Sequence, residues 1–150
     1  MANITLFSQI ISKLDREKFK KLVSTKQTDK HNKGFNSWTH LVSMLFCQFA
    51  KSTSVRDISN GLRSATGNLN HLGIKTAPSK SSISYQNGKR DADLFKDLYF
   101  KLLEQLGQHT KERRIKLKIK VPVYLLDSTL ISLCLSLFDW ATYRTKKGAV

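Results

Sequence analysis

The chain has 150 residues, 40% of them hydrophobic, which is enough for one domain with a buried core and excludes an intrinsically disordered protein. Its 26 Lys and Arg residues outnumber 11 Asp and Glu residues, and the formal net charge of +15 indicates a polyanionic partner, nucleic acid before an anionic membrane surface. No apolar run reaches the roughly 18 residues of a spanning helix and the N-terminus does not resemble a secretory signal, so we expect a cytoplasmic protein without a membrane partner.

The first 110 residues are expected to form helices. Apolar residues recur at helical spacing from Phe7 to Leu14, and Asp15 then has the position of an N-cap for a second helix, with Phe19 placed to pack across its start. A third helix is expected after Ser37, where apolar residues follow a 3.6-residue period. We interpret this stripe as core packing rather than as a stacking surface for bases; it consists of Trp38, Leu41, Val42, Leu45, Phe46 and Phe49.

A fourth helix is expected to start at Ser54, because Asp57 follows three residues later, as in a capping box. Arg56 lies in this segment and is a candidate contact with DNA. The short apolar face expected for the helix consists of Val55, Ile58 and Leu62. A connection rich in Gly and Asn follows, and Pro78-Ser79 is a start signal for a fifth helix.

The fifth segment, KSSISYQNGKR over residues 80–90, is polar on nearly every face and has one aliphatic residue, Ile83. Serine, amide and basic side chains reach base edges and phosphates from a helix in the major groove. Two helices joined by a connection are also the parts of a helix-turn-helix, although this connection is longer than the usual 3–4 residues. The alternative is an ordinary solvated helix. The candidate DNA-binding residues here are Lys80, Ser81, Ser84, Gln86, Asn87, Lys89 and Arg90.

A sixth helix is expected from Asp91 to about Leu106 and should close the helical core. Two adjacent apolar lines run along it: Leu94, Leu98, Leu102 and Leu106 on one, and Phe95, Tyr99 and Leu103 on the other. A basic segment follows over residues 107–120, in which six Lys and Arg residues accompany one acid, Glu112. We interpret residues 111–120 as a basic linker, either a solubilising surface or a contact with the DNA backbone.

A short strand is expected in VYLLD, residues 123–127, with Asp127 at its carboxyl end, where open sheets carry their chemistry. A carboxylate buried in an apolar strand costs several kcal/mol when it has no partner. The alternative is an aspartate that caps the strand-to-turn junction through Ser128 and Thr129. Because a single strand is not stable by itself, it must either pair within the 150 residues or lack its sheet partners.

Five blocks of the sequence resemble, in the same order, the N-terminal part of bacterial insertion-sequence transposases of the DDE class, in the insertion-sequence-four group. They are SVRDI at 54–58, HLGI at 71–74, SKSSISYQNGKR at 79–90, LLDSTLISL at 125–133 and FDWATYRTKKGAV at 138–150. The resemblance covers nearly the whole chain. It implies a mainly α protein, with a helical DNA-binding domain over residues 1–110, followed after the linker by an incomplete, C-terminally truncated α/β ribonuclease H-like catalytic domain over residues 121–150.

The resemblance also implies that Asp127 is the first catalytic carboxylate and a metal ligand for Mg²⁺. In such enzymes three carboxylates hold two divalent ions at the reacting phosphodiester. The second aspartate and the glutamate lie downstream in full-length members and have no counterpart here, since Asp139 belongs to another motif. One carboxylate supplies too few ligands, so we expect this chain to be catalytically inactive by itself. Arg144, Lys146 and Lys147 match a basic stretch of the family and are predicted to contact the DNA backbone.

The predicted function is that of a transposase fragment, which binds double-stranded DNA at the terminal inverted repeats of its own element. Strand cleavage and transfer are expected only of the full-length family member. We further hypothesise a homo-oligomer, or a mixed oligomer with full-length transposase. The alternative function is a stand-alone helix-turn-helix-like DNA-binding regulator or inhibitor of transposition. A module for RNA or acidic protein surfaces is a third hypothesis, against which the lack of aromatic residues among the basic ones argues.

Overall fold

The computed structural model describes residues 4–65 and 67–111, and this part of the chain is mainly helical, as expected. Its elements are α1 (Ile4–Ser12), α2 (Arg16–Lys26), α3 (Ser37–Phe49), α4 (Val55–Ser64), the 3₁₀ helix η1 (Leu69–Leu72), α5 (Lys80–Lys89) and α6 (Asp93–Lys111). No strand occurs within the described ranges. The strand expected at 123–127, and the rest of the segment 121–150, lie outside the described residues.

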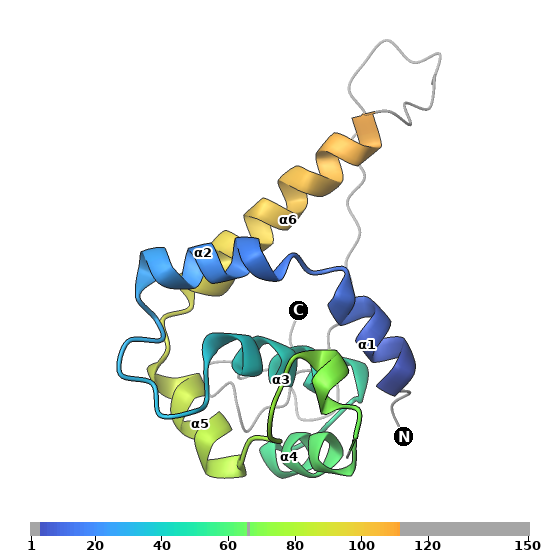
Figure 1. The fold of residues 1–150 in the computed structure, drawn as a ribbon, viewed down its shortest axis with the longest axis vertical. Helices are drawn as coiled ribbons and strands as arrows, with labels where there is room; N and C mark the ends of the chain where they lie inside the picture. Colours follow the sequence, from blue (N-terminus) through green and yellow to red (C-terminus); the bar gives the residue numbers. More distant parts are fainter. Residues whose placement is uncertain (1–3, 66, 112–150) are drawn as a thin grey trace, which may run out of the picture.

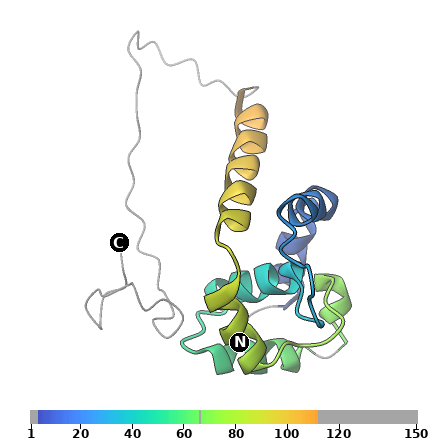
Figure 2. The same ribbon diagram turned by 90° about the vertical axis from the view of Figure 1, so that its left-hand side faces the viewer.

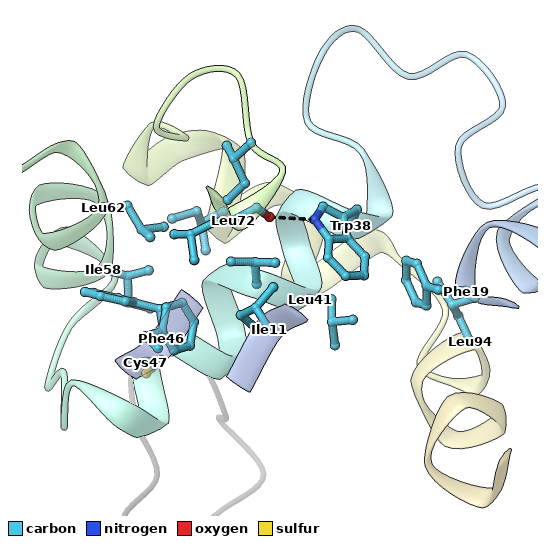
Figure 3. Close-up of a cluster of buried hydrophobic side chains, with 14 of the residues drawn as sticks. Ile11, Phe19, Trp38, Leu41, Phe46, Cys47, Ile58, Leu62, Leu72 and Leu94 are labelled. Atoms are coloured by element: carbon cyan, nitrogen blue, oxygen red, sulfur yellow. Dashed lines mark hydrogen bonds between the residues drawn. The ribbon is translucent and has the colours of Figure 1, made fainter. Parts of the chain in front are cut away.

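Helix α3 is the centre of the fold, with α1, α4 and α5 packed around it and η1 against α1 (Figure 1). The stripe expected on α3 supplies much of the core, because Trp38, Val42 and Phe46 are buried together with Ile58 and Leu62 of α4 (Figure 3). Burial of this apolar surface is the main stabilising term of the helical unit. The interpretation of Trp38 as a core residue is confirmed, since its side chain is 7% exposed.

Trp38 also ties the connection between α4 and α5 to the core. Its indole Nε1 donates a hydrogen bond of 2.9 Å to the backbone oxygen of Leu72 in η1 (Figure 3). The guanidinium of Arg16 lies 4.8 Å from the centre of the Trp38 ring and donates to the backbone oxygen of Gly73. A side chain at Gly73 would meet that guanidinium and would also need a positive φ of 69°. These contacts fix a long connection that has no regular structure outside η1.

Local capping chemistry sets where four of the helices begin. The side chains of Asp15, Ser54 and Ser79 each accept a hydrogen bond from the backbone N–H three residues later, which confirms the expected starts of α2, α4 and α5. Helix α3 begins at Ser37 itself, because Asn36 is the residue that caps it through the N–H of Thr39.

Two expected core contributions are wrong. Phe49 is the last residue of α3, and its ring is 50% exposed although it packs on Phe7 with a centroid distance of 5.6 Å. Along α6, Leu94 is fully buried, but Tyr99 and Leu103 are largely exposed. The 11 residues of α2 span about 16 Å, whereas the 19 residues of α6 span about 28 Å. Helix α6 therefore extends beyond the helix that it packs against (Figure 2).

Two helical glycines allow a matched test of the packing between α3 and α4. A Cβ at Gly61 of α4 would lie 2.6 Å from the buried Phe46 ring, whereas a Cβ at Gly88 of α5 has no neighbour within 4 Å. We expect Gly88→Ala to stabilise the protein by roughly 0.5–1 kcal/mol through helix propensity. Gly61→Ala should instead destabilise it by about 1–3 kcal/mol, because the core must move to admit the methyl group.

Urea unfolding followed by circular dichroism measures both changes. Equal stabilisation by the two substitutions would show that the Phe46 ring does not press on α4.

Candidate nucleic-acid interface

Helix α5 presents one continuous polar face to solvent. The exposed residues on this side, which we call the α5 outer face, are Ser81, Ser84, Tyr85, Gly88 and Lys89. Their spacing of three and four residues places them together along the helix, and Lys80 is exposed beside them in the first turn. Ile83 lies on the opposite side and is fully buried. Ile83 is the residue through which α5 joins the hydrophobic core.

The position of α5 is fixed by α3 and α4. The three helices contact one another pairwise, so α5 is the third member of a tri-helical assembly (Figure 1). The hydroxyl of Ser59 on α4 donates a buried hydrogen bond of 2.8 Å to the backbone oxygen of Pro78, directly before α5. The Ser79 cap then starts the helix at Lys80. A helix that carries polar side chains outward on such a support is geometrically suited to enter a groove.

Tyr85 belongs to the α5 outer face but was not among the DNA contacts predicted from the sequence. It is 60% exposed, and its hydroxyl accepts a hydrogen bond of 2.8 Å from Nζ of Lys89. This bond raises the pKa of Lys89 above its usual value, so the amine stays charged. Its place on this face could have been predicted from the sequence spacing, because Tyr85 follows Ser84 and lies four residues before Lys89.

Gln86 and Asn87 were predicted to contact DNA together with the serines, but they do not lie on the α5 outer face. Both are half-buried on the flanks of α5. Asn87 lies toward His40 of α3, whose side chain is 2% exposed between the rings of Phe35 and Phe95. Burial and the nearby charge of Arg90 lower the pKa of His40 from 6.5 to about 4, and the Asn87 side chain acts in the opposite direction. His40 is therefore neutral at neutral pH.

Arg90 departs most from its predicted role, because its side chain is 2% exposed and cannot lie along a DNA backbone. Its Nη2 contacts Oδ1 of Asp29 at 3.3 Å and donates to the backbone oxygen of Phe35 at 3.1 Å. The same Asp29 oxygen accepts hydrogen bonds of 2.8 Å from the backbone N–H and the hydroxyl of Ser37, at the start of α3. Arg90 thus joins the end of α5 to the loop between α2 and α3.

Of the remaining candidate residues, only Arg56 lies in the part of the chain that the structure describes. Arg56 is exposed in the first turn of α4. Asp127, Arg144, Lys146 and Lys147 lie outside the described residues. Within residues 4–65 and 67–111, no three His, Cys, Asp or Glu side chains come together as a metal site. None of the described helices is both long and apolar enough to cross a membrane.

Comparison with known proteins gives one match. Residues 2–75 are similar to the family described as "Domain of unknown function (DUF4372)", which is commonly found in transposase-like proteins. No curated protein and no solved structure matches the chain. The matched range contains α1 to α4 and η1, and it ends before α5 begins.

The ion pair between the buried Arg90 side chain and Asp29, which is 30% exposed, should be strongly coupled in stability. We expect Asp29→Asn to cost about 3 kcal/mol, because it leaves a buried guanidinium without its carboxylate. Arg90→Met removes the charge as well, so the double variant should be less destabilised than the sum of the two single variants. Chemical denaturation of the four proteins measures this coupling, and additive changes would contradict it.

His40 should make the protein sensitive to acid in a defined window. A histidine whose folded pKa lies below its unfolded value stabilises the protein above pH 6.5 and loses this contribution as the pH falls toward about 4. The loss should approach about 3 kcal/mol at the acid end of the window. We expect His40→Gln to flatten the pH dependence of unfolding between these values.

The matched control is His71→Gln, since His71 is exposed in η1. A variant of His40 with the same pH dependence as the parent protein would show that another group titrates in this window.

Proposed function

We propose that the helical unit binds double-stranded DNA with α5 in the major groove, as the DNA-binding part of a transposase. The observation that carries the proposal is the α5 outer face, which displays hydroxyls and a cation on a helix held by α3 and α4. A ten-residue helix is about 15 Å long, and its diameter of about 10–12 Å with side chains fits a major groove that is about 12 Å wide. The similarity of residues 2–75 to a family found in transposase-like proteins supports the same conclusion.

The residues of the α5 outer face divide into two roles. Ser81 and Ser84 carry hydroxyls that donate and accept hydrogen bonds, which suits base edges. Lys80 and Lys89 carry charges that suit phosphates, and Tyr85 orients the Lys89 amine. Gly88 lies between them with open space at its Cα, so the backbone of α5 can approach the floor of the groove closely.

The terminal inverted repeats of an insertion element are the DNA that we propose as the target, on the resemblance to insertion-sequence transposases. Asp127 remains the predicted catalytic residue and Mg²⁺ ligand, a role that the same resemblance implies. The net charge of +15 is compatible with binding to any nucleic acid. Among nucleic acids, the polar α5 outer face favours duplex DNA.

The test is binding of the 150-residue chain to duplexes selected from a random library, measured by fluorescence anisotropy over a salt series. We expect Lys89→Gln to weaken binding to selected and scrambled duplexes alike and to lower the salt slope by about 1. We expect Ser84→Ala to lower the ratio of selected to scrambled affinity by roughly tenfold, with little change in the slope. Lys13→Gln, at an exposed lysine after α1, is the matched control.

Selection of no preferred duplex, or equal effects of Lys13→Gln and Lys89→Gln, would contradict the assignment of α5 as the recognition helix.

A further inference from the structure

A basic hollow lies beside the α5 outer face. Its volume is about 650 Å³, and the loop between α2 and α3 lines it together with the last two turns of α5. The cationic residues on its lining are Lys26, Lys30, Lys33, Lys89 and Arg90, and Tyr85 lies among them. The loop and α5 lie side by side here although they are distant in sequence (Figure 1). Asp91 is the one carboxylate on the described lining.

Most of the positive charge in the hollow is uncompensated. Lys26 is paired with Asp97 of α6 at 2.8 Å, and Arg90 is paired with Asp29. Within the described residues, Lys30, Lys33 and Lys89 form no ion pair. The Arg90 guanidinium lies behind them with Nε and Nη1 buried and without an acceptor in the described part of the chain. Cations gathered around a concave surface raise the local concentration of anions.

The loop that carries Lys30 and Lys33 is held by hydrogen bonds. Asp29 holds its base by accepting from Ser37 and by pairing with Arg90. Two backbone turns follow, in which the N–H of Lys30 donates to Gln27 and the N–H of Asn32 donates to Asp29, each at 3.1 Å. Asn32 also bonds the Asp29 carboxylate with its side-chain amide. These bonds hold the loop backbone through Lys30 and up to Asn32, directly before Lys33, relative to α5.

Tyr85 and Lys89 belong to both the hollow and the α5 outer face. A duplex that receives α5 in its major groove has a sugar-phosphate backbone along each edge of that groove. The hollow lies along one flank of α5, where one of these backbones passes. Three lysines on a concave flank are suited to bind phosphates of one strand, since each exposed ammonium offers three donors.

We propose that the basic hollow is a phosphate-backbone site for one strand of the DNA duplex, in which Lys30 and Lys33 of the loop act with Lys89 of α5. This inference rests on the proposed binding of duplex DNA by α5 and adds the α2–α3 loop as a second contact region. Its lysines neutralise phosphates without reading bases, so they set affinity and register and leave sequence preference to the α5 outer face.

The experiment compares the full chain with two double variants that remove the same charge. Lys30→Gln/Lys33→Gln removes the loop contacts, and Lys20→Gln/Lys21→Gln removes two exposed lysines of α2 as the control. Binding to a 24-base-pair duplex from the selection and to its scrambled version is followed from 50 to 300 mM NaCl. Unfolding midpoints in urea establish that all proteins are folded.

We expect the loop variant to bind both duplexes about tenfold or more weakly at low salt, with an unchanged ratio between them. The slope of log K against log salt should fall by about 1.8, which corresponds to two phosphates. Ethylation of single phosphates should weaken binding of the parent protein at the contacted positions and have no further effect on the loop variant there. The control pair should leave the slope unchanged.

A slope that is equal in the parent and loop variants, with Lys89→Gln still lowering it, would overturn the hollow as a phosphate site and leave the α5 proposal standing. A chain that binds no duplex at any salt concentration would overturn both. A changed ratio between selected and scrambled duplexes in the loop variant would show that the loop reads bases, which contradicts the backbone role.

Discussion

The carboxylate of Asp29 is the constraint on which the candidate interface depends. One of its oxygens accepts two hydrogen bonds from Ser37 at the start of α3 and contacts Arg90 at the end of α5, 61 residues away. An acid at the N-terminus of a helix also stabilises that helix through its dipole. A single side chain therefore sets the loop between α2 and α3, the beginning of the central helix and the end of α5 against one another. The direction in which α5 presents its outer face follows from this connection.

Behind this pair, the structure keeps a polar side chain neutral inside an aromatic cluster. His40 lies between Phe35 and Phe95 with Arg90 nearby, and both burial and that positive charge lower its pKa to about 4. Protonation would place a second cation beside a guanidinium that has one carboxylate partner in the described residues. Acid is therefore expected to destabilise the junction of α3, α5 and α6, which is the part that supports the proposed DNA-binding helix.

Much of the local structure could be predicted because it depends on neighbours in sequence. Caps at Asp15, Ser54 and Ser79 act over three residues, and the apolar period of α3 marks its buried side within one helix. The polar composition of residues 80–90 likewise indicated a helix that is not built for the core, and Ile83 is its one fully buried residue. Periodicity does not tell which apolar residues another element covers, and Phe49 and Tyr99 lie on the expected apolar lines but are largely exposed.

The sequence by itself determined the helical class of the described residues, three of the helix starts and the strongly basic character of the chain, because these depend on composition and short-range chemistry. Only the tertiary structure decided which polar residues of α5 reach solvent. It buried the Arg90 side chain in an ion pair with Asp29, turned Asn87 toward His40 and brought Lys30 and Lys33 beside Lys89. Each of these outcomes depends on the packing of α5 against α3 and against a loop more than 50 residues before it, and such long-range contacts leave no period or spacing in a single sequence.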